Sequence, residues 1–283
     1  MKRILILISL ITLGLCAQAQ AQAQAQTKDH KADYERQVRM MGIAGLGVDS
    51  IINRWAEESP EDTDMLTARF NYDFVKSQSN NVIQKNQKKY LGKAPIMTLK
   101  DSLNNDVFYF EDIQFNDELV GSALKAIDKA ISINPSELRH RISKISALMM
   151  YEKESPDLAV AQINELIDLN KTTEWTFDGE KADSELFCQM VGEYCVSLFQ
   201  IASPASYEYF LNLSEKMSKL FPKNTVFINN IGSYWQVAKK DNKKAAKFYK
   251  KALKINPEDY AASKNMKIIE ASNAASRSKK GRS

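Results

Sequence analysis

The feature that most constrains the fold is an amphipathic segment of thirteen residues that occurs four times. The copies are ALKAIDKAISINP (123–135), AVAQINELIDLNK (159–171), FLNLSEKMSKLFP (210–222) and AAKFYKKALKINP (245–257). Their starts lie 36, 51 and 35 residues apart, and the polar stretch 170–185 accounts for the longer interval as an insertion. Within each copy the apolar residues recur at helical spacing, and three of the four copies end at a proline, which stops a helix. A period near 35 residues indicates a fold built from repeated units.

A second amphipathic run precedes each of the last three copies, at 137–151, 184–201 and 225–238. The repeated unit is therefore a helix, a turn and a second helix. Glycine (10) and proline (7) are scarce among the 283 residues, which disfavours a turn-rich β fold. We predict an all-α protein.

The segment 225–257 resembles the tetratricopeptide repeat (TPR), a helix–turn–helix unit of about 34 residues. The positions that carry the resemblance are the Leu-Gly pair, the aromatic and small positions and the closing proline of that family, occupied here by Ile231, Gly232, Trp235, Ala245, Tyr249, Ala252 and Pro257. The turn AKKDN is one residue longer than in the family, and the copies 137–171 and 184–222 lack most signature residues. The resemblance implies an α-solenoid over residues 120–273, closed by a capping helix, with Trp235 buried between the helices of its repeat.

The resemblance also implies a function. Proteins of this family commonly bind a protein or peptide in a concave groove, which the first helix of each repeat lines. In the best copy this makes Asn229, Ser233 and Gln236 the expected binding residues, because they are the polar positions on one face of that helix. Two histidines and three cysteines offer no ligand motif, so we expect no metal. We expect no catalysis and no cofactor because no catalytic motif is evident, and no nucleic-acid partner because the N-terminus described below predicts export.

The N-terminal third, residues 27–119, changes character along its length. Helical patterns run through residues 36–58 and, after Ser59-Pro60, through residues 64–85. Two short β-rich stretches, Ile96–Leu99 and Val107–Phe110, then flank the turn-rich DSLNND. This pattern predicts a β-hairpin at 94–111 that either covers the groove or forms a contact surface.

The first 26 residues have the pattern of a secretory signal peptide. Lys2 and Arg3 precede a run of about twelve apolar residues, which is too short to span a membrane, and Ala-x-Ala cleavage sites follow in 16–26. We therefore expect export to the periplasm or the extracellular space. Lipid anchoring at Cys16 is an alternative, although Leu15 before it is larger than the residue usual at such sites.

Charge is distributed unevenly along the chain. Residues 239–283 contain 14 basic and 4 acidic residues, whereas residues 27–238 contain 23 basic and 31 acidic residues. We expect residues 274–283 to form a basic disordered tail.

The predicted function is an exported TPR-like scaffold. One alternative is an envelope structural component held at an anionic surface by its basic C-terminal end, and another is a hydrolase with its site in the N-terminal third, for which the sequence offers no motif.

Three further residues carry expectations. Cys188 and Cys195 fall on one face of a helix about 10.5 Å apart, beyond the reach of a disulfide, so we predict two buried thiols. His140 lies between Arg139 and Arg141, which favours a solvated helix face.

Overall fold

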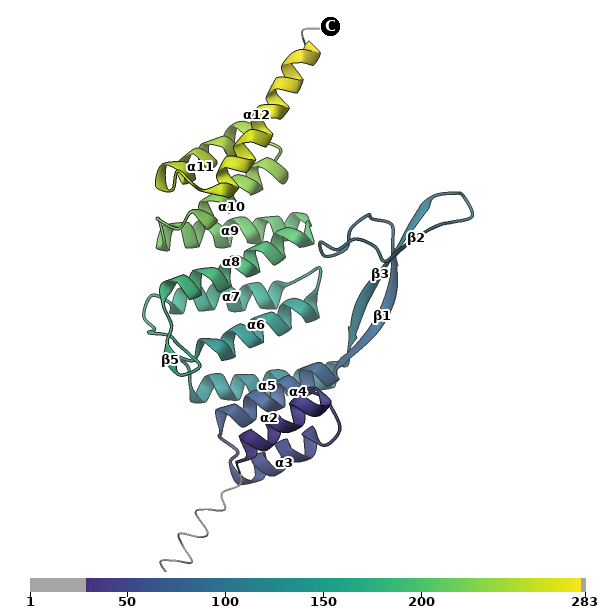
Figure 1. Ribbon diagram of the computed structural model, residues 1–283, viewed down its shortest axis with the longest axis vertical. Coiled ribbons are helices and arrows are strands. Elements are labelled where there is room, and N and C mark those ends of the chain that lie inside the picture. Colours follow the sequence, from purple (N-terminus) through teal and green to yellow (C-terminus); the bar gives the residue numbers. More distant parts are fainter. Residues whose placement is uncertain (1–28, 281–283) are drawn as a thin grey trace, which may run out of the picture.

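The computed structural model describes residues 29–280, and the side chains of residues 29–274. Its helices stack along the long axis of an elongated molecule, from α2 at one end to α12 at the other (Figure 1). The predicted signal peptide and Cys16 lie outside the described residues. The helices are α2 (His30–Met41), α3 (Val48–Glu58), α4 (Thr63–Lys76), α5 (Asp117–Ile133), α6 (Leu138–Glu152), α7 (Asp157–Leu169), α8 (Ser184–Ile201), α9 (Pro204–Leu220), α10 (Thr225–Val237), α11 (Asn242–Ile255) and α12 (Tyr260–Lys280).

Consecutive helices pack as pairs, α4 with α5, α6 with α7, α8 with α9 and α10 with α11, and α12 packs on α11. Contacts also join α2 to α4 and α8 to α10, and on the other side α7 to α9. The first helices of the pairs thus form one layer, called here the first-helix layer, and the second helices form another. This arrangement confirms the predicted α-solenoid of helix–turn–helix repeats. Between Asp29 and Lys280, none of the helices is both long enough and apolar enough to cross a membrane.

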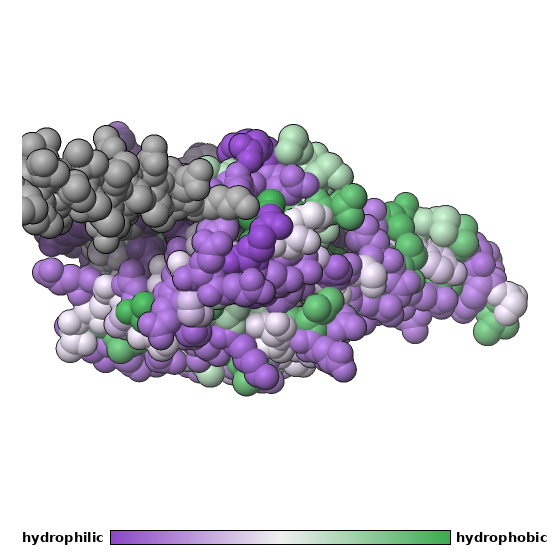
Figure 2. Space-filling view, turned by 90° about the horizontal axis from the view of Figure 1, so that it is seen from below, coloured by the Kyte–Doolittle hydropathy of each residue, from purple (hydrophilic) through white to green (hydrophobic). Residues whose placement is uncertain are grey.

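A three-stranded antiparallel sheet is inserted between the two helices of the first pair. Its strands are β1 (Gln78–Lys85), β2 (Met97–Lys100) and β3 (Asp106–Phe115), in the order β1-β3-β2. The hairpin of β2 and β3 confirms the predicted one, and Asp101 closes its turn by accepting the N–H groups of Leu103 and Asn105, each at 2.8 Å. The sheet projects to one side of the solenoid (Figure 1), and hydrophobic residues lie among hydrophilic ones along this arm (Figure 2).

Strand β1 was expected to be helical. Helix α4 ends at Lys76 because four of the next five residues are serines or asparagines, which are poor helix formers, and the hydroxyl of Ser77 donates to the carbonyl of Phe74. The residues that follow then pair with β3 from Gln78 to Lys85. The spacing of apolar residues continued through residues 78–85 and therefore predicted a helix there. The serines and asparagines after Lys76 ended the helix instead.

Two other boundaries differ from the sequence expectations. The helical run 36–58 is broken between α2 and α3, where Gly42 and Gly47 both adopt a φ of +82°, a conformation that favours glycine. At the other end, α12 continues to Lys280, where a disordered tail from residue 274 was expected. The segment that extends it, AASRSKK (274–280), contains two alanines, an arginine and two lysines but no glycine or proline, so its composition favours helix.

The last pair packs as the repeat pattern requires. A Cβ atom placed on Gly232 of α10 would lie 2.6 Å from Cε1 of Tyr249, so only glycine permits this approach of the two helices. Ala245, Tyr249 and Ala252 are completely buried. Trp235, expected to be buried, is only partly so, and the Nζ of Lys244 lies 3.2 Å from its ring centroid. The buried aromatic residues of α10 are Phe227 and Tyr234 instead.

The insertion 170–185 forms a two-stranded hairpin, β4 (Thr176–Phe177) and β5 (Glu180–Lys181), which lies over the start of α6. Trp175, which precedes it, is buried in the central core, and its indole N–H donates to Asn170 at 3.0 Å. The insertion is therefore fixed to the solenoid, and its turn is held in place beside α6.

Candidate functional site

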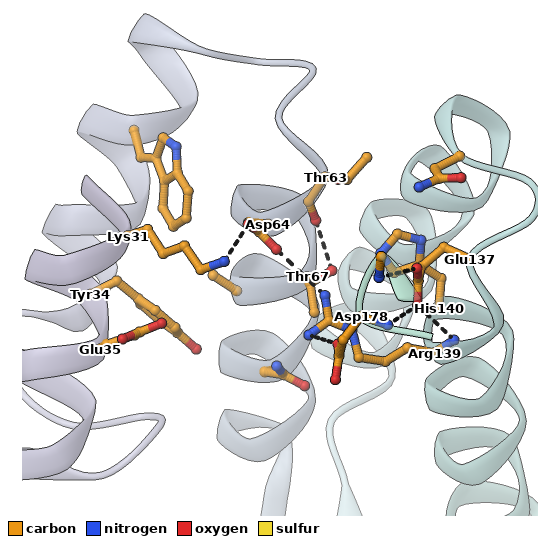
Figure 3. A pocket seen from close by; sticks show the side chains of 15 residues that line it. Lys31, Tyr34, Glu35, Thr63, Asp64, Thr67, Glu137, Arg139, His140 and Asp178 are labelled. Atoms are coloured by element: carbon orange, nitrogen blue, oxygen red, sulfur yellow. Dashed lines mark hydrogen bonds and ion pairs between the residues drawn. The ribbon is translucent and has the colours of Figure 1, made fainter. Parts of the chain in front are cut away.

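An open polar cavity of about 540 Å³ lies between α2, α4 and the start of α6, beside the turn of the β4–β5 hairpin. Lys31, Tyr34 and Glu35 line it from α2, and Thr63, Asp64 and Thr67 line it from α4, while Arg139 and His140 face them from α6 (Figure 3). Because α4 and α6 are first helices of their pairs, the cavity opens on the first-helix layer.

Glu137 fixes the wall that α6 and the hairpin form. Only 4% of this residue is exposed, and its carboxylate accepts the N–H groups of Asp178 (2.9 Å) and Gly179 (3.2 Å) and the hydroxyl of Thr176 (3.0 Å). It also accepts the N–H of Arg139 and so caps α6. Burial raises the pKa of this carboxyl, but the hydrogen bonds outweigh burial and hold the pKa of Glu137 below its ordinary value.

Asp64 joins the two sides of the cavity. Its carboxylate lies 2.7 Å from the Nζ of Lys31 on α2 and 3.5 Å from Nη2 of Arg139 on α6. The hydrogen bond from Lys31 to Asp64 raises the pKa of Lys31. Arg139 in turn pairs with Asp178 of the hairpin at 2.8 Å. A chain of ion pairs therefore runs across the floor from α2 through α4 to the hairpin.

His140 is the residue of this site whose polar atoms are least satisfied. It is 1% exposed, and its Nδ1 is buried with no hydrogen-bond partner among the described residues, as is Nε of Arg139. Burial, followed by the charge of Arg139, lowers the pKa of His140, so the ring is neutral near pH 7. The expectation of a solvated histidine was wrong. Helix α6 packs against neighbours on two sides, so a face without an apolar stripe is buried as well.

The charges around the cavity do not cancel. Two cationic side chains, Lys31 and Arg139, stand against the four carboxylates of Glu35, Asp64, Glu137 and Asp178. This excess of negative charge favours a ligand that carries positive charge, while the unpaired Nε–H of Arg139 requires an acceptor such as a carbonyl oxygen.

The residues predicted to bind a ligand lie in the last pair, far along the stack from this cavity (Figure 1). The amide Nδ2 of Asn229 donates to both carboxylate oxygens of Asp259, at 3.0 Å each, and Asp259 caps α12. The hydroxyl of Tyr249 lies 3.3 Å from that of Ser233 and donates to Gln236 at 2.6 Å. All three side chains thus make contacts within the last pair and its cap, although Oδ1 of Asn229 is buried with no partner among the described residues. Their role in binding a ligand stays a prediction.

No local pattern in the sequence indicates the cavity, because its residues come from four segments that are separated by up to about 140 residues and meet only in the stack. The nearest signal was the sequence Pro135-Ser136-Glu137 before a helix, which is typical of an N-terminal cap. It locates Glu137 at the start of α6 but does not reveal what the carboxylate holds.

A second, less polar cleft of about 840 Å³ separates the sheet from the C-terminal ends of α6 and α8. The loop between β1 and β2 returns to the solenoid here, since Gly92 approaches the side chain of Gln200 closely. The sheet therefore encloses a space beside the first-helix layer, lined among others by Val82, Ile113 and Met150.

Among the described residues, neither the cysteines nor a group of metal-ligating side chains marks a further candidate site. Cys188 and Cys195 are buried free thiols, as predicted, and burial raises their pKa values to about 11 and about 12. Across residues 29–280 there is no group of three His, Cys, Asp or Glu side chains with the geometry to hold a metal ion.

Comparison with known proteins adds fold-level likenesses only. No protein-family model matches the sequence, and no curated protein matches it. Among solved structures the chain is similar to a MamA protein (11% identity, 81% of this chain and 91% of that one, TM-score 0.43). It is also similar to YrrB, described as a TPR protein with an unusual peptide-binding site (12% identity, 89% of this chain and 97% of that one, TM-score 0.43). A third similar structure is MamA from Desulfovibrio magneticus RS-1 (13% identity, 82% of this chain and 95% of that one, TM-score 0.41). The repeat assignment rests on the helix pairs themselves.

Proposed function

We propose that the protein is an exported, non-catalytic scaffold that binds a polypeptide segment against its first-helix layer, with the polar cavity between α2, α4 and α6 as the anchoring site. The observation that carries this proposal is the pair of unpartnered buried atoms, Nδ1 of His140 and Nε of Arg139, beside an open cavity. Buried polar groups are nearly always hydrogen-bonded, so atoms left without a partner beside an open cavity indicate where a ligand supplies one.

A polypeptide satisfies this site better than a small anion or a small apolar molecule. Its carbonyl groups accept from Arg139, and its N–H groups or basic side chains donate to the excess carboxylates. The first-helix layer then continues past the cavity along α6 and α8, which the hydroxyl of Tyr194 joins, and a longer chain has further surface to contact there. We therefore expect the preferred segments to carry net positive charge and their binding to weaken as salt increases.

The experiment is selection of peptides from a random display library, followed by calorimetric titration of the enriched peptides into the purified chain. Thr67→Phe places a bulky ring in the cavity, and His140→Phe keeps a ring of similar size but removes both nitrogen atoms. We expect each variant to bind about tenfold or more weakly, as for the loss of one hydrogen bond in a desolvated site.

Ser233→Ala and Gln236→Ala serve as the comparison, because they test the alternative site on α10. The proposal predicts that these two variants bind the enriched peptides within about twofold of the parent chain. If they weaken binding and the two cavity variants do not, the ligand lies on α10 and the cavity is not the anchoring site.

A further inference from the structure

A dense group of unpaired positive charges on the described surface lies on α11, near the opposite end of the stack from the cavity (Figure 1). Lys243, Lys247, Lys250, Lys251 and Lys254 are all exposed, and in the part of the chain that the structure describes none of them has an acidic partner. Two nearby lysines differ, since Lys239 pairs with Glu208 at 3.1 Å and Lys244 lies over the ring of Trp235. We call the first five residues the lysine face.

The lysine face is compact. At 100° per residue the five side chains fall within about 100° of the helix circumference, opposite the completely buried Ala245, Tyr249 and Ala252. From Lys243 to Lys254 the helix rises about 17 Å, so neighbouring charges are separated by distances close to the screening length of about 8 Å at physiological salt. Their mutual repulsion is therefore only partly screened, and a partner with negative charge relieves it.

Apolar side chains border this face. Ile255 follows about 40° beyond Lys251 around α11 and is 39% exposed. Tyr260, at the start of α12, is 76% exposed, and the Nζ of Lys264 lies 5.8 Å from its ring centroid. An exposed tyrosine and an isoleucine beside lysines match the chemistry of a bilayer interface, where aromatic rings sit among the headgroups and lysines reach the phosphates.

We propose that the lysine face, together with Ile255 and Tyr260, docks the protein on an anionic phospholipid bilayer. The absence of arginine from α11 favours a membrane over an acidic protein. Lysine is a compact charge on a flexible stem that suits a fluid surface of many phosphates, whereas arginine is the usual choice for fixed carboxylate pairs in protein interfaces. The site is separate from the peptide cavity, so one end of the solenoid can hold a membrane while the other holds a ligand.

The test is cosedimentation of the purified chain with phosphatidylcholine vesicles that do or do not contain phosphatidylglycerol, at low and at high salt. The variant combines Lys247→Gln, Lys250→Gln and Lys254→Gln, and its matched control combines Lys88→Gln, Lys89→Gln and Lys125→Gln, which are exposed lysines elsewhere. Both proteins lose the same charge and share the same N-terminus. Removing three lysines from the docking face should weaken binding about 100-fold, at about fivefold per lysine, and the control should bind as the parent chain does.

A tyrosine variant, melting temperatures and a polyglutamate control complete the test. Tyr260→Ser should weaken binding to phosphatidylglycerol vesicles severalfold, and the melting temperatures of all variants should equal that of the parent chain, because every substituted side chain is exposed. The proposal is overturned if the parent chain does not bind phosphatidylglycerol vesicles at low salt, or if the triple variant and its control bind equally. Binding to polyglutamate as tight as to vesicles, and lost in the triple variant, would overturn it in favour of an acidic polypeptide partner.

Discussion

The two histidines of the described chain have opposite environments, and their comparison isolates what a partner contributes to a buried ring. Nε2 of His30 lies 2.8 Å from the carboxylate of Glu58, whereas Nδ1 of His140 has no partner among the described residues. Both rings are almost completely buried. The first histidine has a partner within the fold, whereas Nδ1 of the second has none among the described residues.

His140→Phe should therefore stabilise the free protein. Replacing an unpaired buried polar group by an apolar group of similar shape removes a desolvation cost of about 1–3 kcal/mol. His30→Phe should not share this gain, because Nε2 of His30 already has a partner in Glu58. Urea unfolding of both variants measures the difference, and a His140→Phe protein that is no more stable than His30→Phe would show that His140 has an internal partner.

His140 should also make the free energy of unfolding depend on pH. The pKa of His140 is lowered in the folded state from its ordinary value of about 6.5, so below pH 6.5 the unfolded chain binds a proton that the folded chain resists. The free energy of unfolding should therefore decrease as the pH falls from about 6.5 toward the lower folded pKa, and should be insensitive to this group above pH 6.5.

Glu137 titrates in a lower window, because its pKa is held below the ordinary value of 4.5, and it contributes stability that is lost as the pH falls through that lower value. Urea unfolding at a series of pH values separates the two groups. In His140→Phe the slope just below pH 6.5 should become smaller while the loss at lower pH remains, and an unchanged slope would mean that His140 titrates normally.

At the scale of elements, the close approach of α10 and α11 depends on one glycine. Gly232→Ala introduces a Cβ that would lie 2.6 Å from Tyr249, and we expect it to destabilise the protein by about 1–3 kcal/mol through overpacking. Gly121→Ala on α5 is the matched control, since no atom lies within 4 Å of its added Cβ. That variant should be more stable by about 0.5–1 kcal/mol, the difference in helix propensity. Thermal unfolding of both variants would contradict this account if they shifted in the same direction.

The element scale also shows what sequence reasoning could and could not reach. Most helices of the four repeated pairs were predictable, because amphipathic spacing recurs with a period near 35 residues and three of the four copies end at a proline. Strand β1 was not predictable in this way, because it pairs with β3, about thirty residues away, and its partner is invisible to a local pattern. The break between α2 and α3 required the left-handed conformations of Gly42 and Gly47, which spacing alone does not reveal.

The candidate site was less predictable than the fold. Resemblance to the repeat directed attention to Asn229, Ser233 and Gln236, which the structure places in contacts between α10, α11 and the start of α12. The cavity instead depends on how Lys31, Asp64 and Arg139 meet across three helices. These side chains meet only when the helices pack against one another, so the sequence of a single repeat does not reveal the cavity.

For the whole molecule, the uneven charge of the sequence becomes a separation along the stack. The acidic cavity lies at the end formed by α2 to α6, and the lysine face lies on α11 near the other end (Figure 1). The two proposed activities therefore use different surfaces, and variants of one surface should leave the other unaffected. A His140→Phe protein that retains vesicle binding would agree with this separation.

The most direct test of the central claim is hydrogen–deuterium exchange of the chain alone and saturated with a peptide enriched by display. The account predicts that the peptide slows exchange in residues 63–76, 134–142 and 176–180, which surround the cavity, and leaves exchange in α10 and α11 unchanged. Protection confined to residues 225–262, with none around His140, would contradict it and would assign ligand binding to the last repeat.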